Sequence, residues 1–293
     1  MREIGMRIRQ RALALLTDGT VQRALGWAES DVPGQWNLAA FETAGEMENL
    51  HYGEYAGANL SKLCLKFNRA EGKTLVILKP CDALSFNRLL KEHRLDREKF
   101  YVMGAGCKGM RDENGPLLKC GTCKGKEFAV ADEVIDDSES RAAPASDRFL
   151  GVEMIEEMSP AERFHFWRGE LSRCIRCNAC RNVCPACTCV KCVFDNPNSG
   201  VAAKANASDF EEDMFHIIRA YHVAGRCTDC GECSRVCPQK IPLHLLNRKF
   251  IRDINALYGD FQAGEEDGER TPMTMFEKTD AEPGIVAERG KRG

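Results

Sequence analysis

The chain has 293 residues, a formal net charge of −3, and 43% hydrophobic and 29% charged residues. This length allows one large domain or two ordinary ones, and the composition is typical of a soluble globular protein. The small net charge does not favour nucleic acid as a partner. No stretch approaches the ~20 apolar residues of a membrane helix, so we predict no membrane span.

Cysteine is unusually frequent, with 16 residues. Disulfide frameworks are typical of small exported proteins. The N-terminus does not resemble an export signal, because its only apolar run, residues 12–16, is too short. In a reducing compartment, clustered thiols indicate metal sites. We therefore expect a cytoplasmic, metal-binding protein.

The first half of the chain predicts an α/β domain. Residues 3–16 predict a helix, followed by short strands and glycine-rich loops. Residues 73–79 form an apolar run with β-branched members, which indicates a buried strand. Residues 82–95 have apolar positions at helical spacing, and residues 99–103 predict a second strand. Strand, helix and strand together indicate a βαβ unit.

The second half is predicted to be mainly helical. A polar stretch at residues 136–147 indicates a linker. Ser159 and Pro160 predict the start of a helix, and Ser208 with Glu211 has the pattern of a capping box that opens a second helix. A turn is expected at residues 196–200, and a final helix is expected from Leu243 to about Tyr258.

Three segments follow from this pattern. We predict an α/β domain at residues 1–150. Because residues 174–185 and 227–238 repeat a cysteine motif typical of two-cluster ferredoxins, we predict an α-helical, ferredoxin-like dicluster domain at residues 160–260. After Phe261 the composition turns to Gly, Glu, Asp, Pro and Arg, which predicts a flexible, disordered tail at residues 261–293.

The strongest functional signal is a motif that occurs twice, Cys-x2-Cys-x2-Cys-x3-Cys-Pro. In such a run the first three thiolates bind one 4Fe–4S cluster, and the fourth binds the other cluster. Structural zinc is the alternative, but zinc ligands usually come as two Cys-x2-Cys pairs. The ligands predicted for the first cluster are Cys174, Cys177, Cys180 and Cys237, and those for the second are Cys227, Cys230, Cys233 and Cys184.

A second set of cysteines lies beside glycine or proline in the α/β half, and consists of Cys81, Cys107, Cys120 and Cys123. Strand ends in an open α/β sheet meet at one edge, where ligands collect. Exposed backbone N–H groups in glycine-rich turns can donate to cluster sulfurs. We interpret this set as a third 4Fe–4S site, with zinc or unliganded thiols as alternatives.

The remaining cysteines are Cys187, Cys189 and Cys192, directly behind the first motif, and Cys64. Together they number four, which suggests a fourth site. Spare thiols or residues that shield a cluster are an equally good interpretation. His165, His216, His222 and His244 are expected to pack near the clusters rather than to bind metal.

The loop Gly104–Gly109 follows a predicted strand and superficially resembles a phosphate-binding turn. It lacks the full dinucleotide fingerprint and the Lys-Ser/Thr pair of a P-loop. FAD in this domain stays an alternative without a supporting motif.

Several segments together carry a family resemblance. They are Lys79-Pro80-Cys81-Asp82-Ala83-Leu84, Gly106-Cys107-Lys108-Gly109, the first motif from Cys174 to Pro185, the run from Cys187 to Cys192, and Arg219 to Cys227. The chain resembles the formate dehydrogenase β-subunit-like iron–sulfur proteins of anaerobic bacteria and archaea. These are related to the β subunits of deazaflavin-reducing hydrogenases and formate dehydrogenases.

The resemblance implies an electron-transfer subunit of a cytoplasmic oxidoreductase complex, with no catalytic residues of its own. Its partners would be a catalytic unit, such as a formate dehydrogenase, a hydrogenase or a methylenetetrahydrofolate reductase, and a flavin- or cluster-bearing subunit like those of heterodisulfide reductase. Larger relatives bind FAD and reduce the deazaflavin coenzyme. A flavin-binding reductase subunit is therefore the alternative function, and a zinc-stabilised adaptor is a third.

Overall fold

The computed structural model describes residues 1–125, 127–141, 147–196, 198, 209–265, 272 and 278. The capping box predicted at Ser208 and Glu211 falls outside the described residues and side chains. The same is true of most of the turn predicted at 196–200, of residues 142–146 of the predicted linker, and of most of the predicted tail.

The first half of the chain is built around a five-stranded sheet with the order β2-β1-β3-β4-β7. β1 and β2 are antiparallel, whereas β1, β3, β4 and β7 are parallel to one another. The strands are β1 (Arg23–Glu29), β2 (Trp36–Phe41), β3 (Thr74–Leu78), β4 (Phe100–Ala105) and β7 (Glu133–Ile135). A separate two-stranded sheet pairs β5 (Arg111–Asp112) with β6 (Gly115–Pro116).

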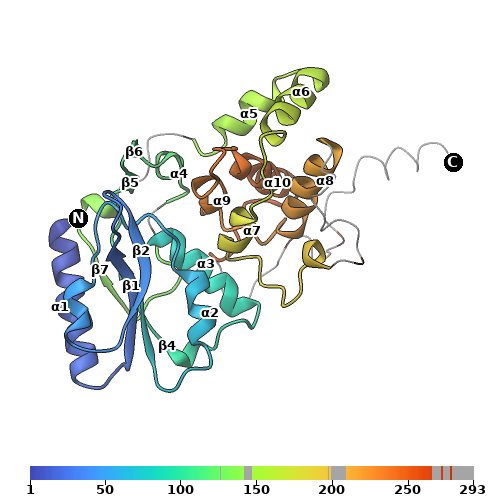
Figure 1. Ribbon diagram of the computed structural model, residues 1–293. Coiled ribbons are helices and arrows are strands. Elements are labelled where there is room, and N and C mark those ends of the chain that lie inside the picture. Colours follow the sequence, from blue (N-terminus) through green and yellow to red (C-terminus); the bar gives the residue numbers. More distant parts are fainter. Residues whose placement is uncertain are drawn as a thin grey trace.

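Helices cover both faces of the larger sheet (Figure 1). On one side lies α1 (Arg2–Thr17), and on the other lie α2 (Cys64–Phe67) and α3 (Pro80–Lys91). All five residues of β3 are buried, as expected for a central parallel strand covered by helices. The predicted βαβ unit is confirmed as β3, α3 and β4. α3 begins at Pro80, two residues earlier than predicted, because proline suits the first turn of a helix.

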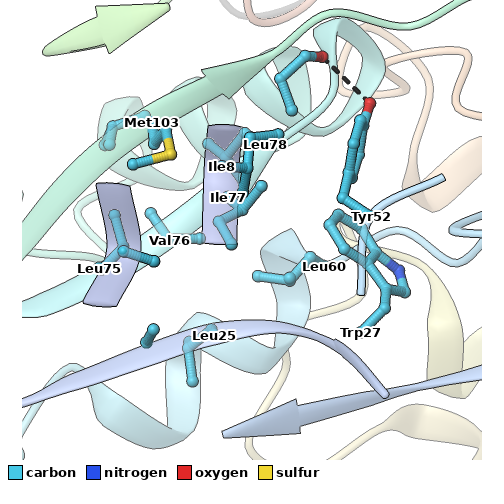
Figure 2. Packing of buried hydrophobic residues seen from close by; sticks show 14 of the residues in the cluster. Ile8, Leu25, Trp27, Tyr52, Leu60, Leu75, Val76, Ile77, Leu78 and Met103 are labelled. Carbon is cyan, nitrogen blue, oxygen red and sulfur yellow. Dashed lines mark hydrogen bonds between the residues drawn. The ribbon is translucent and has the colours of Figure 1, made fainter. Parts of the chain in front are cut away.

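The core of this half lies between the sheet and its helices (Figure 2). Ile8 of α1 and Leu75 to Leu78 of β3 are fully buried in it. Tyr52 is 5% exposed, and its hydroxyl donates to the carbonyl oxygens of Ala105 and Gly106 at 3.2 and 2.9 Å. This contact holds the carboxyl end of β4 just before Cys107.

The second half is helical and lies beside the carboxyl ends of β3 and β4 (Figure 1). Its elements are α5 (Leu150–Glu156), α6 (Pro160–Leu171), α7 (Ala179–Val183), α8 (Asp209–His222), α9 (Glu232–Arg235) and α10 (Leu243–Tyr258), and α4 (Leu118–Gly121) precedes them. The predicted start of α6 is confirmed, because Ser159 and Glu162 form a capping box. None of the helices in the described parts of the chain is long and apolar enough to cross a membrane.

Packed structure continues beyond the position where we predicted the flexible tail to begin. Gln262 and Ala263 are each 2% exposed. The Gln262 side chain donates to the carbonyl oxygen of Cys227 at 3.0 Å, and the Asn87 side chain donates to that of Gly264 at 2.9 Å. Residues 261–265 therefore belong to the packed structure, which corrects the predicted boundary.

A buried ion pair joins the two halves. Lys119 of α4 bonds Glu232 of α9, and their side chains are 8% and 0% exposed. Arg235 makes two further hydrogen bonds of 2.8 Å to Glu232. Burial raises the pKa of Glu232, but Lys119 and Arg235 outweigh it and lower that pKa to about 2.

We expect Glu232→Gln to lower the free energy of unfolding by about 3 kcal/mol, because it leaves the buried Lys119 cation without its counter-charge. Thermal unfolding followed by circular dichroism under anaerobic conditions measures the change. Glu42 is the matched control, since its bond to Arg23 is 3.4 Å and its side chain is 62% exposed. Glu42→Gln should have almost no effect. Equal midpoints for the two variants would contradict the prediction.

Candidate iron–sulfur sites

The two predicted motifs have the same backbone conformation at matching positions. Arg176 and Asn178 flank the middle cysteine of the first motif, with φ angles of 55° and 62°. Asp229 and Gly231 flank the middle cysteine of the second, with φ angles of 54° and 67°. Non-glycine residues rarely adopt this left-handed conformation. Its recurrence shows that both motifs fold into the same tight turn, followed by the short helices α7 and α9.

The cysteines predicted for the second cluster lie in one pocket. Cys227, Cys230, Cys233 and Cys184 line it together, so the fourth cysteine of the first motif does meet the first three of the second. Hydrogen bonding to Cys187 and burial raise the pKa of Cys184, and burial raises the pKa of Cys233 to about 11. Buried thiols of this kind bind metal with release of a proton.

Three of the four cysteines predicted for the first cluster pack around one small apolar core. Cys180 is part of this core, and Cys174 and Cys237 pack against it. The backbone N–H of Arg176 donates to the Cys174 sulfur at 3.3 Å. Cys177 is exposed, which places this predicted site at the surface of the chain.

Arg219 of α8 lies between the two sets. It is 1% exposed, and none of its three guanidinium nitrogens has a hydrogen-bond partner in the described part of the chain. Burial lowers the pKa of Arg219, but the thiols of Cys233, Cys180 and Cys184 more than offset this and raise it. A buried, unpaired cation is costly. The negative charge of ligated clusters would compensate it, so the residues present fit a pair of anionic clusters.

The third predicted set is also brought together. Cys81, Cys107, Cys120 and Cys123 line one pocket, which Cys230 of the second motif lines as well. Cys81 lies in the first turn of α3, and Cys107 follows β4, at the carboxyl ends of two adjacent strands. Backbone N–H groups donate to two of these sulfurs: Gly109 to Cys107 at 3.4 Å, and Met110 to Cys120 at 3.3 Å.

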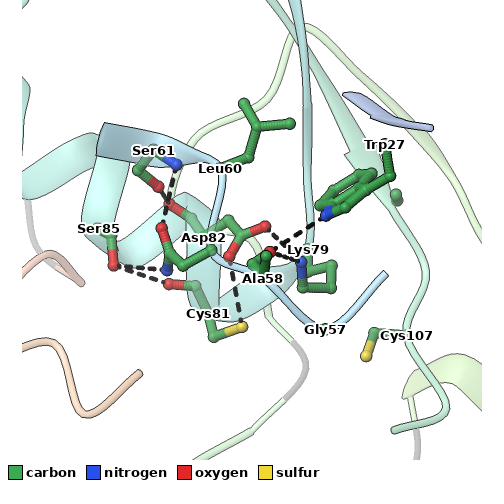
Figure 3. Close-up of polar contacts among 12 residues, drawn as sticks. Trp27, Gly57, Ala58, Leu60, Ser61, Lys79, Cys81, Asp82, Ser85 and Cys107 are labelled. Atoms are coloured by element: carbon green, nitrogen blue, oxygen red, sulfur yellow. Dashed lines mark hydrogen bonds and ion pairs between the residues drawn. The ribbon is translucent and has the colours of Figure 1, made fainter. Parts of the chain in front are cut away.

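A buried cation supports this third pocket. Lys79 lies between the Trp27 ring and Asp82, at 4.1 Å from the ring centroid and 2.7 Å from the carboxylate (Figure 3). The Asp82 side chain is also 3.7 Å from the Cys81 sulfur. Lys79 and Lys119 both line the pocket. Burial and Asp82 raise the pKa of the Cys81 thiol, and the two lysines offset part of this increase.

The fourth predicted set is only partly assembled. Cys187, Cys189 and Cys192 line a further pocket. Cys64 does not line it, because α2 turns its fully buried side chain into the core of the sheet half, with the sulfur 4.0 Å from the Leu60 carbonyl oxygen. The grouping of Cys64 with the other three was therefore wrong.

Sequence reasoning noted that lysines near the third set could offset thiolate charge, but it missed the roles of Lys119, Glu232 and Arg219. Lys119 and Glu232 are 113 positions apart, and no local pattern predicts such a pair. Arg219 lies four residues from both Phe215 and Val223, so the three share one side of the helical segment, and all three are buried. Its position on that face is the signal that could have marked it as an inward-facing cation. Among the described residues, no three Cys, His, Asp or Glu side chains surround a single-ion position.

We expect Arg219→Gln to shift the midpoint potentials of the dicluster region to more negative values. A unit charge about 7 Å from a cluster, at an effective dielectric constant of ~20, contributes ~2 kcal/mol, or about 90 mV for one electron. Redox titration followed by electron paramagnetic resonance measures the shift. Arg219→Lys keeps the charge and should retain most of the wild-type potential. Unchanged potentials in Arg219→Gln, with the iron content intact, would contradict this role.

Comparison with known proteins agrees with this geometry. The family model of the 4Fe–4S dicluster domain matches residues 170–241, which include all eight motif cysteines. The chain is 31% identical to the F420-dependent formate dehydrogenase subunit beta of Methanocaldococcus jannaschii over 124 residues, which is 41% of this chain and 31% of that protein. The chain thus aligns with about a third of that relative.

A second relative is the putative ferredoxin-3 of Sinorhizobium fredii, which is 32% identical over 79 residues, 27% of this chain and 75% of that protein. The dicluster domain indicates two 4Fe–4S clusters. The chain therefore belongs to the ferredoxin-type iron–sulfur proteins that carry a 4Fe–4S dicluster domain, and part of it is similar to a formate dehydrogenase β subunit.

Proposed function

We propose that this chain is an electron-transfer subunit that relays electrons within a cytoplasmic oxidoreductase complex of the formate dehydrogenase, hydrogenase or heterodisulfide-reductase-like type. An iron–sulfur electron-transfer role is supported by both relatives and by the dicluster domain. The name of one relative describes it as a subunit of a formate dehydrogenase, which supports a complex with catalytic and flavin- or cluster-bearing partner subunits.

One observation carries the proposal. Cys230 lines both the pocket of the second motif and the pocket of Cys81, Cys107, Cys120 and Cys123. If these four cysteines hold a third 4Fe–4S cluster, the three sites form a continuous series. The series runs from the sheet edge to the exposed Cys177. A small free ferredoxin needs no such extension, whereas a relay between two partners does.

The proposed division of labour follows from the same contacts. The α/β part, at residues 1–150, holds the third site at its sheet edge, and the helical part, at residues 160–260, holds the paired clusters. Cys174, Cys177, Cys180 and Cys237 are the proposed ligands of the first cluster, and Cys227, Cys230, Cys233 and Cys184 those of the second. The clusters supply one-electron chemistry. The chain holds them, shields them and sets their potentials through buried charges.

The test uses the full chain purified anaerobically, alone and with its co-purifying subunits. Cys120→Ala should lose about four iron and four sulfide per chain and slow the reduction of the dicluster region by the partner's substrate. Glu42→Gln, at a side chain that is 62% exposed and lies outside every cysteine pocket, is the control and should change neither. A Cys120→Ala variant that keeps all its iron would remove the third site from the series.

Two other outcomes would replace the proposed function. Zinc in place of iron and sulfide would identify an adaptor with structural metal sites. Stoichiometric flavin, together with reduction of a soluble cofactor by the chain alone, would identify a catalytic reductase subunit.

A further inference from the structure

The pocket lined by Cys187, Cys189 and Cys192 belongs to neither motif. Its volume is about 580 Å³, which falls in the range of sites that hold a bound group rather than a water molecule. The three thiols reach it from the segment between α7 and the short helix Val193–Asp195. His222, at the end of α8, adds an imidazole to the same lining.

Cations surround these thiols. Lys62, Arg181, Arg219 and Arg226 all line the pocket. Two of them are neutralised by carboxylates outside the thiol group: Arg181 bonds Asp195 at 2.7 Å, and Arg226 bonds both oxygens of Glu92 at 2.6 Å. These pairs fix the walls of the pocket and add little net charge to it.

The other two cations have no carboxylate facing them in the described part of the chain. The charged groups that face Lys62 are the thiols of Cys187 and Cys184 and the guanidinium of Arg181. Arg219 is 1% exposed and has no hydrogen-bond partner among the described residues. The pocket therefore has one cation of its own, Lys62, and shares Arg219 with the paired motif clusters, so its occupant should be anionic.

Three thiolates and an imidazole suit two kinds of occupant, a zinc ion or an iron–sulfur cluster. Sulfurs bound to one zinc ion lie about 3.8 Å from one another, given a Zn–S distance of ~2.3 Å. A pocket of about 580 Å³ is far larger than that arrangement needs. A cubane fills more space, and with three thiolates it has a charge of about −1 when oxidised and −2 when reduced, an anion that suits a pocket lined by Lys62 and Arg219.

We infer that Cys187, Cys189 and Cys192 hold a further 4Fe–4S cluster, with His222 as its fourth ligand and Lys62 and Arg219 as its counter-charges. The site replaces the four-cysteine arrangement that included Cys64. Cys189 is exposed, and Val190 beside it is 98% exposed. The cluster therefore lies at the surface, where a redox partner can approach it closely.

The experiment compares the iron, sulfide and zinc contents of full-length variants purified anaerobically. Cys189→Ala with Cys192→Ala should lose about four iron and four sulfide per chain relative to the wild type. Cys64→Ala is the matched control, because Cys64 was the fourth cysteine of the original grouping and does not line the pocket. It should keep the full iron content. Circular dichroism and the paramagnetic signals of the two motif clusters show whether each variant is folded.

Several results would overturn the inference. Loss of one zinc ion with unchanged iron would identify a zinc site, and unchanged metal in the double variant would leave the three cysteines as spare thiols. A loss of iron in Cys64→Ala equal to that in the double variant would restore the discarded ligand. Iron missing from the wild-type chain altogether would instead contradict the proposed function, so the two failures are distinguishable.

His222 has a test of its own. A thiolate in place of a neutral imidazole adds negative charge to a cluster and lowers its potential. His222→Cys should therefore keep the iron content of the wild type and shift one cluster signal to a more negative potential. If no potential changes, His222 is not a ligand and the inferred four-ligand site is wrong.

Discussion

The buried pair of Lys119 and Glu232 determines how the two halves of this chain fit together. Neither charge is tolerated in an interior without the other, so the interface has one arrangement in which both are satisfied. Each residue is also the neighbour of a cysteine, Cys120 in one half and Cys233 in the other. The pair therefore fixes the distance and orientation between two sets of sulfur atoms that come from different parts of the sequence. A contact that stabilises the fold thus also fixes the spacing on which electron transfer between the proposed sites would depend.

The turns around the motif cysteines show a second constraint, on the backbone. Arg176, Asn178 and Asp229 adopt left-handed conformations that cost free energy for residues with a side chain. Such conformations persist where the surroundings require them. The requirement here is geometric, because three sulfurs must face one centre from within seven consecutive residues. Local strain in these turns is offset by the bonds to the bound cluster, as in other domains in which metal binding contributes to folding.

Much of the fold could be predicted because it is encoded locally. The apolar β-branched run at residues 73–79 gave a buried strand, Ser159 and Pro160 gave the start of α6, and residues 243–258 matched α10. The two motifs were recognisable because ligand spacing within a turn is a property of a few adjacent residues. The structure also brings Cys81, Cys107, Cys120 and Cys123 into one pocket, as expected from strands that end at a common edge.

What sequence reasoning could not supply depends on contacts between distant residues. Cys64 was grouped with the last three cysteines by number alone, but its place on α2 directs it into the sheet core. Arg219 and Lys119 act on the cysteines because both are buried. A sequence indicates burial only through the spacing of its apolar residues. The beginning of the predicted tail was misjudged for a similar reason. Its polar composition gives no indication that the Gln262 side chain donates a hydrogen bond to the carbonyl oxygen of Cys227.

Burial and exposure together suggest a direction for the proposed relay. Cys233 and Cys184 are 7% and 9% exposed, so the second cluster would lie inside the chain, screened from water. Cys177 and Cys189 are exposed and would bring their clusters to the surface. Arg219 faces the thiols of Cys233, Cys180, Cys184 and Cys187, so its single buried charge acts on the buried site and on both surface sites. An electron placed on any one of these clusters would repel the next electron and so offset part of the attraction that the guanidinium exerts on it. The sites should therefore accept electrons one at a time, and the proposed surface clusters would be the positions at which partners exchange them.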